Sequence, residues 1–316
     1  MKVLVTGANG FVGRHLVPQL SMSHDVAVAE RKPTASSLKS FTVGDIGADT
    51  DWGLALTDID VVVHLAARVH VMNETASDPL EAFKAVNTAG TQRLAEASVR
   101  QGVKKLVFLS SIKVNGERTT THPFESSDDP DPRDPYAISK LEAEEALLRA
   151  TENSSTEAVI LRSPVIYGTG VGGNIARIAQ AIKKGVPLPL GNVDNRRTML
   201  SVDNLTKWIT AAAEEPTPRN PVLMGDPSPI STRDLVRHLA DGMNRSPRLF
   251  SVPLGGLRLG ARLLGREAFI DRLVDNLEIT PEWGAFQSTA RSAFATPDVE
   301  LRRLGTSFVE EASFVE

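Results

Sequence analysis

The chain has 316 residues, of which 41% are hydrophobic and 23% are charged, and its formal net charge is −4. This length suggests about two domains, and the acidic balance argues against a protein that binds nucleic acid through the phosphate backbone. The sequence contains no cysteine, which excludes disulfide bonds and thiolate metal ligands. The first apolar run is too short for the core of a secretory leader and no run of ~18 apolar residues occurs, so we expect a cytoplasmic protein without membrane insertion.

Apolar runs alternate with segments of helical periodicity over the first half of the chain. The predicted strands are 2–6, 25–29, 60–65, 105–110 and 157–162, and the predicted helices are 11–20, 79–101 and 136–150. Gly102 follows the long second helix as a candidate C-cap, and 115–135 forms a loop too long for a plain connection. Strands that alternate with helices predict an α/β protein with a Rossmann-type, doubly wound parallel sheet.

The regular alternation weakens after about residue 162, where proline and glycine become frequent. Further helices are predicted at 174–184, 203–213 and 231–242, with a pair of amphipathic helices within 254–277. A helix lying on a membrane surface is the less favoured interpretation of 254–277. We therefore predict a dinucleotide-binding domain at 1–165 and a smaller C-terminal α/β substrate domain at 166–316. A return of the chain to the first domain around 197–213 is left open.

A glycine-rich loop separates the first strand from the first helix. Its spacing, Gly7-x-x-Gly10-x-x-Gly13, provides a tight turn, a close approach of the backbone to phosphate and close packing of the helix on the strand. The helix N-terminus then faces the phosphates. The predicted dinucleotide-binding residues here are Gly7, Asn9, Gly10, Phe11, Val12 and Gly13.

The end of the second strand carries conflicting signals for the cofactor. Glu30 is the acidic residue expected about 20 positions after the glycine loop, where it would bind the adenosine ribose of NAD(H). Arg31 and Lys32 follow it and would suit the 2′-phosphate of NADP(H). Asp45 and Ile46 are candidate adenine contacts. We favour NAD(H) slightly, because Glu30 occupies the acid position.

Tyr136 and Lys140 lie at positions i and i+4 of a predicted helix and therefore share one of its faces. A nearby cation and the positive nicotinamide of an oxidised cofactor would favour the phenolate, which makes Tyr136 a candidate proton carrier. Ser110 and Ser111 end the preceding strand, at the carboxyl edge of the sheet where ligands bind in such folds.

The glycine loop, Ser111 and the Tyr136/Lys140 pair, in this order, resemble the short-chain dehydrogenase/reductase superfamily. The segments 86–91 and 110–116 resemble its extended branch of nucleotide-sugar epimerases, dehydratases and reductases. The resemblance implies that Ser111 is the catalytic hydroxyl, that Tyr136 is the acid/base, and that Lys140 holds the nicotinamide ribose. It also implies cofactor contacts from Leu65, Ala66, Ala67, Asn87 and Pro164.

Departures from the family pattern narrow the choice within this branch. Its 4,6-dehydratases carry an Asp-Glu pair after the catalytic hydroxyl, whereas this chain has Ile112 and Lys113, so we do not expect that activity. Asn115 replaces a tyrosine that is usual in the family. The resemblance implies substrate contacts from Arg68, Ser111, Lys113, Asn174 and Arg197, the last two at a sugar diphosphate. Arg196 competes with Arg197 for this role, and 280–316 matches no family pattern.

Segments 67–72 and 110–117 resemble bacterial enzymes of surface-polysaccharide synthesis. We therefore favour 4-keto reduction of a UDP-linked 4-keto-6-deoxy-N-acetylhexosamine. The alternative is a UDP-hexose or UDP-N-acetylhexosamine 4-epimerase, which would use the same residues, and a remote alternative is a non-catalytic dinucleotide-binding sensor. The resemblance also implies a homodimer formed by the helices that begin near Pro79 and Tyr136. The six histidines show no metal-ligand spacing, and we predict no metal site.

Overall fold

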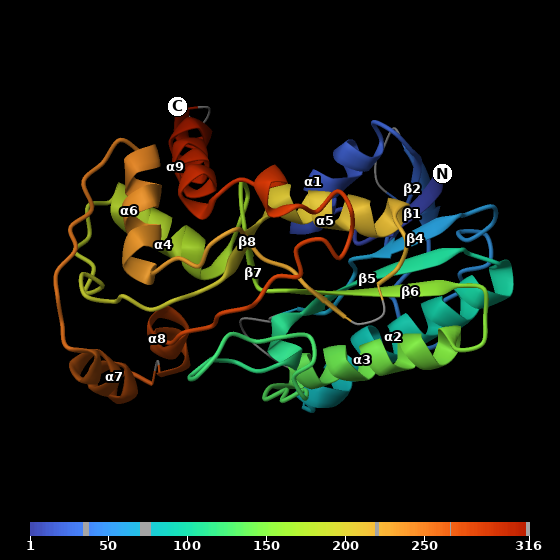
Figure 1. The fold of residues 1–316 in the computed structure, drawn as a ribbon, viewed down its shortest axis with the longest axis horizontal. Helices are drawn as coiled ribbons and strands as arrows, with labels where there is room; N and C mark the ends of the chain where they lie inside the picture. The colour runs from blue at the N-terminus through green and yellow to red at the C-terminus, as the bar shows by residue number, and fades with distance from the viewer. Residues whose placement is uncertain (34–37, 70–76, 219–220, 266, 314–316) are drawn as a thin grey trace.

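The computed structural model describes residues 1–33, 38–69, 77–218, 221–265 and 267–313 (Figure 1). Seven parallel strands form the central sheet in the order β3-β2-β1-β4-β5-β6-β9. Their bounds are Lys2–Thr6 for β1, Asp25–Glu30 for β2, Lys39–Thr42 for β3, Val61–His64 for β4, Lys105–Ser111 for β5, Glu157–Ser163 for β6 and Val222–Leu223 for β9. The predicted Rossmann-type parallel sheet is therefore confirmed. The segment His70–Met72, part of the resemblance above, lies outside the described residues.

Helices cover both faces of this sheet (Figure 1). Helices α1 (Phe11–Leu20) and α5 (Val202–Glu214) pack together on one face, and α2 (Pro79–Gln101) and α3 (Pro135–Thr151) pack together on the other. The predicted ends of α2 are confirmed. Asp78 caps the start of the helix by accepting a hydrogen bond from the backbone N–H of Glu81 at 3.2 Å, and Gly102 ends it with φ +72°.

Other segments from the second half of the chain build a smaller lobe at the carboxyl ends of the strands (Figure 1). Its two-stranded parallel sheet consists of β7 (Val165–Tyr167) and β8 (Met199–Ser201). The lobe's helices are α4 (Gly173–Lys183), α6 (Thr232–Gly242), α7 (Leu254–Leu263), α8 (Glu267–Val274) and α9 (Pro297–Ser313), with short 3₁₀ turns at Ile112–Val114 (η1) and Arg291–Ala293 (η2) elsewhere in the chain. The predicted helix pair within 254–277 corresponds to α7 and α8. The division into two domains near residue 165 stays a prediction.

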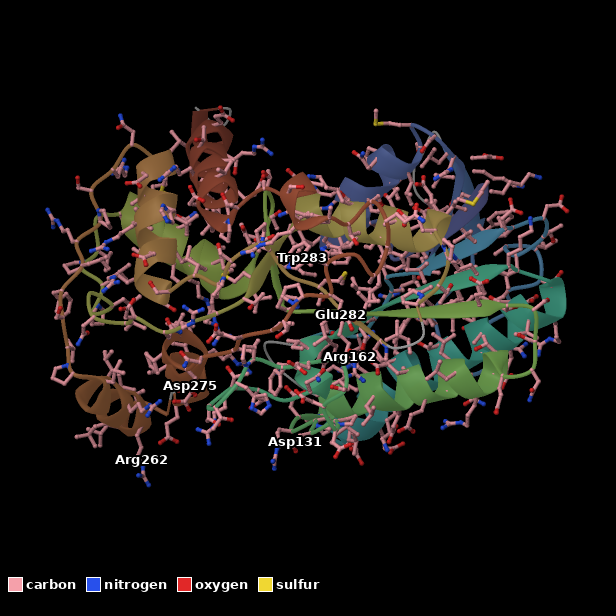
Figure 2. The ribbon with its side chains drawn as sticks, in the orientation of Figure 1. Asp131, Arg162, Arg262, Asp275, Glu282 and Trp283 are labelled. Carbon is pink, nitrogen blue, oxygen red and sulfur yellow. The ribbon has the colours of Figure 1, made fainter. Side chains whose placement is uncertain are left out.

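The chain crosses back between the lobes after α8. Ile279 forms a bridge with Phe124, and Leu277 forms one with Arg197. Glu282 accepts hydrogen bonds from the backbone N–H of Leu223 at 3.1 Å and from the Ser126 hydroxyl at 2.6 Å. Figure 2 shows Glu282 and Trp283 near the middle of the molecule. Through its two hydrogen bonds Glu282 ties the loop between η1 and α3 (115–134) to the sheet. Among the described residues, no helix is both long enough and apolar enough to span a lipid bilayer.

A buried carboxylate, Asp226, connects the two lobes. Its side chain is 1% exposed and accepts hydrogen bonds from the Tyr167 hydroxyl at 2.7 Å, the Asn204 amide at 2.7 Å and the backbone N–H of Ser201. Asn204 also donates to the backbone carbonyl of Ala295 at 2.8 Å. Burial raises the pKa of Asp226 from 3.8 to about 6, against the opposing effect of these donors.

This raised pKa predicts a pH-dependent contribution to stability. The folded protein binds the Asp226 proton more tightly than the unfolded chain does. The contribution of this group to stability is therefore fully present below its pKa of 3.8 in the unfolded chain, and it is lost as the pH rises through its pKa of about 6 in the folded protein. Relative to Asp226→Asn, we expect the wild-type free energy of unfolding to fall by about 3 kcal/mol between about pH 4 and pH 7. Denaturant unfolding at several pH values measures this difference, with exposed Asp129→Asn as the control. A difference between wild type and Asp226→Asn that is independent of pH would contradict the assignment.

Candidate active site

The glycine loop lies between β1 and α1 at the carboxyl edge of the sheet. Gly7 has φ +71°, and a Cβ atom at this position would lie 2.7 Å from the backbone nitrogen of Ala66. A Cβ atom on Gly13 would lie 2.4 Å from the carbonyl oxygen of Gly7, so α1 packs directly on the loop. Gly10 is the N-cap of α1 and has no side chain to occupy the first backbone N–H groups. The loop therefore fits the pyrophosphate of a dinucleotide.

Glu30 lies at the end of β2, 4% exposed, next to this loop. Its carboxylate accepts hydrogen bonds from the Asn9 amide at 2.9 Å and the Ser40 hydroxyl at 2.7 Å. Arg31 and Asp45 point into solvent and form an ion pair with each other at 2.7 Å. Asp45 thus reduces the positive charge that a 2′-phosphate would meet, and these residues fit the ribose of NAD better than that of NADP.

The segment after β4 passes directly in front of the glycine loop. The backbone N–H of Ala66 donates to the Thr6 hydroxyl at 3.2 Å, which joins 65–67 to the end of β1. Asn87, on α2, holds the next residue by accepting from the Arg68 N–H at 2.8 Å and donating to the Arg68 carbonyl at 3.0 Å. Asn87 also donates to the Ser139 hydroxyl at 2.9 Å, and so connects the predicted cofactor wall to α3.

The other predicted cofactor residues also lie near the carboxyl edge. Phe11 and Val12 open α1, and Leu65 and Ala67 flank Ala66. Ile46 packs on α2, with its Cγ2 only 2.5 Å from where a Cβ of Gly90 would lie. Pro164 is buried between β6 and β7. The structure thus gathers the predicted cofactor residues around one edge of the sheet, and their contact with cofactor stays a prediction.

Ser111, Tyr136 and Lys140 come together from two elements. Ser111 ends β5, Tyr136 is the second residue of α3, and Lys140 lies one turn further along that helix. The Ser111 hydroxyl lies close enough to the phenol of Tyr136 to lower the pKa of that phenol. The Lys140 ammonium donates to the Leu109 carbonyl at 2.7 Å and lies 3.8 Å from the centre of the Phe108 ring. The predicted catalytic trio is therefore adjacent in space.

Burial is the largest influence on the pKa values of Tyr136 and Lys140. Burial raises the pKa of Tyr136 to about 12, although the Ser111 hydroxyl acts in the opposite direction. Burial likewise lowers the pKa of Lys140 to about 7, against the opposing charge of Glu144. Lowering of the Tyr136 pKa by Lys140 together with an oxidised nicotinamide stays a prediction.

A buried ion pair that was not predicted from the sequence joins β6 to α3, the helix that carries Tyr136 and Lys140. Arg162 on β6 and Glu144 on α3 approach to 2.6 Å, with side chains 5% and 3% exposed. The Ser110 hydroxyl also donates to Glu144, and Arg162 donates to the Asn115 side chain at 2.9 Å. An arginine in an otherwise apolar strand and a glutamate four residues after Lys140 were the available signals. Asn115 therefore belongs to this network.

Three of the predicted substrate residues are held by other parts of the chain. Lys113 forms ion pairs with Asp134 and, at 3.4 Å, with Glu117. The Arg68 guanidinium lies 5.4 Å from the centre of the Phe83 ring, which itself lies 6.0 Å from the Tyr136 ring. Arg197 is half-buried and donates to the Asp275 carbonyl at 2.9 Å. Substrate contact by these residues stays a prediction.

The neighbouring Arg196 and Arg197 have different surroundings. Arg196 is exposed and pairs with Glu278 at 2.7 Å, whereas burial lowers the pKa of Arg197. Arg197 is therefore the better candidate for a diphosphate, because Arg196 is engaged in a surface ion pair. Asn174 is the second residue of α4, whose N-cap is Gly172.

His64 is the histidine that the fold buries most deeply among those it describes. Its ring nitrogens lie 2.7 Å from the Thr6 hydroxyl and 3.1 Å from the Thr91 hydroxyl, and the ring stacks on Phe108. Burial lowers the pKa of His64 to about 3, so the ring is a neutral, hydrogen-bonded part of the core. Among the described residues, no three His, Cys, Asp or Glu side chains gather as a metal site would require.

Residues 3–223 match the model of the "NAD dependent epimerase/dehydratase family". A UDP-glucose 4-epimerase of Vibrio cholerae is 40% identical over 283 residues, covering 88% of this chain and 86% of that protein. An N-acetyl-alpha-D-glucosaminyl-diphospho-ditrans,octacis-undecaprenol 4-epimerase of Escherichia coli O157:H7 is 29% identical over 209 residues, or 66% of this chain and 61% of that protein.

Solved structures share the whole fold. MoeE5 in complex with UDP-glucuronic acid and NAD superposes with a TM-score of 0.76 and 25% identity, over 99% of this chain and 100% of that one. In that structure the protein holds NAD and a UDP-sugar together. The fold described above thus matches the relative over both lobes.

Proposed function

Because the chain belongs to the NAD dependent epimerase/dehydratase family, we propose that it is an NAD-dependent 4-epimerase of a UDP-linked hexose or N-acetylhexosamine. The observation that carries the proposal is the adjacency of Ser111 and Tyr136 at the carboxyl ends of the strands, with Lys140 one helical turn further along α3. A secondary alcohol at C4 could exchange its proton with this pair. The likeness to two 4-epimerases, one of them 40% identical, favours epimerisation over the 4-keto reduction that the sequence favoured.

Each residue of the trio has a separate task in this proposal. Tyr136 takes the proton of the C4 hydroxyl and returns it to the keto oxygen after the sugar has presented its other face. Ser111 hydrogen-bonds the same oxygen and stabilises the charge that develops on it. Lys140, fixed by the Leu109 carbonyl, would bind the nicotinamide ribose and hold positive charge near the phenolate.

NAD is the cofactor of the family, and the residues present fit it. When bound, it supplies the acceptor and donor of the C4 hydride. The glycine loop and the start of α1 would hold the pyrophosphate of NAD, and Glu30 would bind its adenosine ribose. Residues 65–67 would line the cofactor. Arg197 and Asn174 are our candidates for the substrate diphosphate, since a half-buried guanidinium suits a bidentate anion.

Two other activities have less support. A 4,6-dehydratase needs paired acid/base groups after the catalytic hydroxyl, but Ile112 is buried in an apolar cluster and Lys113 is ion-paired. The 4-keto reductase remains the second candidate, because the trio would serve it equally well. A homodimer formed through α2 and α3 stays a prediction.

The cofactor requirement distinguishes the epimerase from the reductase. We expect the purified protein to interconvert UDP-glucose with UDP-galactose, or UDP-GlcNAc with UDP-GalNAc, without net consumption of NADH. Chromatography of the UDP-sugars measures the conversion, and absorbance measures the cofactor. Stoichiometric loss of NADH with a UDP-4-keto-6-deoxy-N-acetylhexosamine, with neither epimer pair interconverted, would support the reductase and reject our proposal.

A further inference from the structure

An ion pair joins η1, which directly follows β5, to the N-cap of α3. Asp134 is the N-cap of α3 and accepts a hydrogen bond from the backbone N–H of Ala137 at 2.7 Å. Its other carboxylate oxygen accepts from the Lys113 ammonium, and the two side chains are 24% and 19% exposed. Lys113 lies two residues after Ser111, and its backbone N–H donates to the Ser111 hydroxyl at 3.3 Å. Asp134 lies two residues before Tyr136.

We propose that the Lys113–Asp134 ion pair positions Tyr136 against Ser111 and offsets the negative charge of Asp134 beside the phenol. Both are positioning residues, because they act through Tyr136 and Ser111. The proposal rests on the proposed function only in taking Tyr136 as the proton carrier.

The charges around Tyr136 explain why such an offset matters. The carboxylate of Asp134 raises the pKa of Tyr136, adding to the effect of burial. A cation bound to that carboxylate weakens this effect, so the phenolate forms at lower pH with Lys113 present than without it. The charged and polar groups on the surrounding elements include Ser111 on β5, Lys113 on η1 with its second partner Glu117, Asp134, Lys140 and Glu144 on α3, and Arg68, which lies over the Phe83 ring of α2.

The residues next to Lys113 support this role. Ile112, between Ser111 and Lys113, is 3% exposed and packs in a cluster with Leu277 and Ile279. That burial fixes the direction of the chain after β5 and leaves Lys113 facing the start of α3. Lys113 therefore acts through Asp134 and needs no contact with substrate.

Tyrosine labelled at the hydroxyl-bearing ring carbon allows a direct test, because the chain has only two tyrosines. NMR titration of the NAD-loaded protein follows Tyr136, and Tyr167→Phe assigns the signals. We expect Lys113→Met to raise the pKa of Tyr136 by roughly half a unit to one unit, and Asp134→Asn to lower it by a similar amount. Asparagine also caps helices, so α3 should keep its start. The acid limb of the pH profile of kcat should move in the same directions.

Two comparisons separate charge from structure. Lys113→Arg keeps the charge and should retain the wild-type pKa, whereas Lys113→Met in the Asp134→Asn background should shift it by less than half as much as in the wild type. An unchanged Tyr136 pKa in Lys113→Met, or equal shifts in both backgrounds, would overturn the proposal. If the shifts occur but Tyr136→Phe still epimerises UDP-sugars, the proposed function fails and the ion-pair proposal stands.

Discussion

Tyr136→Phe should lower kcat for epimerisation at least about 100-fold, the lower end of what a positioned acid/base group contributes. The substitution removes the phenolic oxygen beside Ser111 and keeps the ring, whose centre lies 6.0 Å from that of Phe83. Binding of NAD should therefore change little. Steady-state kinetics with a UDP-sugar measures kcat, and equilibrium titration measures the Kd for NAD.

The other tyrosine of the chain provides a matched control. Tyr167 is fully buried and donates to Asp226 at 2.7 Å in the region where the lobes meet. Tyr167→Phe also deletes one phenolic oxygen, but we expect it to reduce stability by about 1 kcal/mol and to leave kcat within a few-fold. If Tyr136→Phe turned over within about threefold of the wild type, Tyr136 could not be the proton carrier.

The sheet and its covering helices could be predicted because their signals are local. The valine-rich run at β4, the Pro79 start and Gly102 end of α2, and the glycine loop each reflect a conformational preference of a few neighbouring residues. The family resemblance is confirmed by the match over 3–223. The helix α9 was not predicted, although it packs against α6, because its stability depends on that partner from a distant part of the chain.

The proximity of the candidate catalytic trio could be predicted for the same reason, since Tyr136 and Lys140 are one helical turn apart and Ser111 ends a strand. The surroundings of the trio could not. Whether Lys113 contacts substrate or Asp134, and whether Glu144 is exposed or buried, depends on how α3 lies against β5 and β6. The pKa of Tyr136 is set by burial, which sequence spacing does not reveal. Motifs identify the reacting groups, whereas tertiary packing determines their protonation.

Glu144→Gln should be the most destabilising of the substitutions considered, by about 3 kcal/mol or more in the free energy of unfolding. The variant keeps the shape of the side chain but leaves the guanidinium of Arg162, 5% exposed, without its counter-charge. Glu144 also holds the Ser110 hydroxyl and raises the pKa of Lys140. Loss of that charge should therefore lower the pKa of Lys140 further. Denaturant unfolding measures the stability.

The neighbouring residue makes a stringent control for this prediction. Glu145 pairs with Arg149 at 3.5 Å, but both side chains are more than half exposed, so Glu145→Gln should cost less than about 0.5 kcal/mol. If an unpaired buried charge causes the loss, the double variant Glu144→Gln/Arg162→Met should recover part of it, because methionine fills similar space without a charge. A double variant less stable than Glu144→Gln alone would mean that the hydrogen bond from Arg162 to Asn115, at 2.9 Å, matters more than the charge pair. Arg162 would then hold the 115–134 loop to the sheet through Asn115, and the contribution of Glu144 would be secondary.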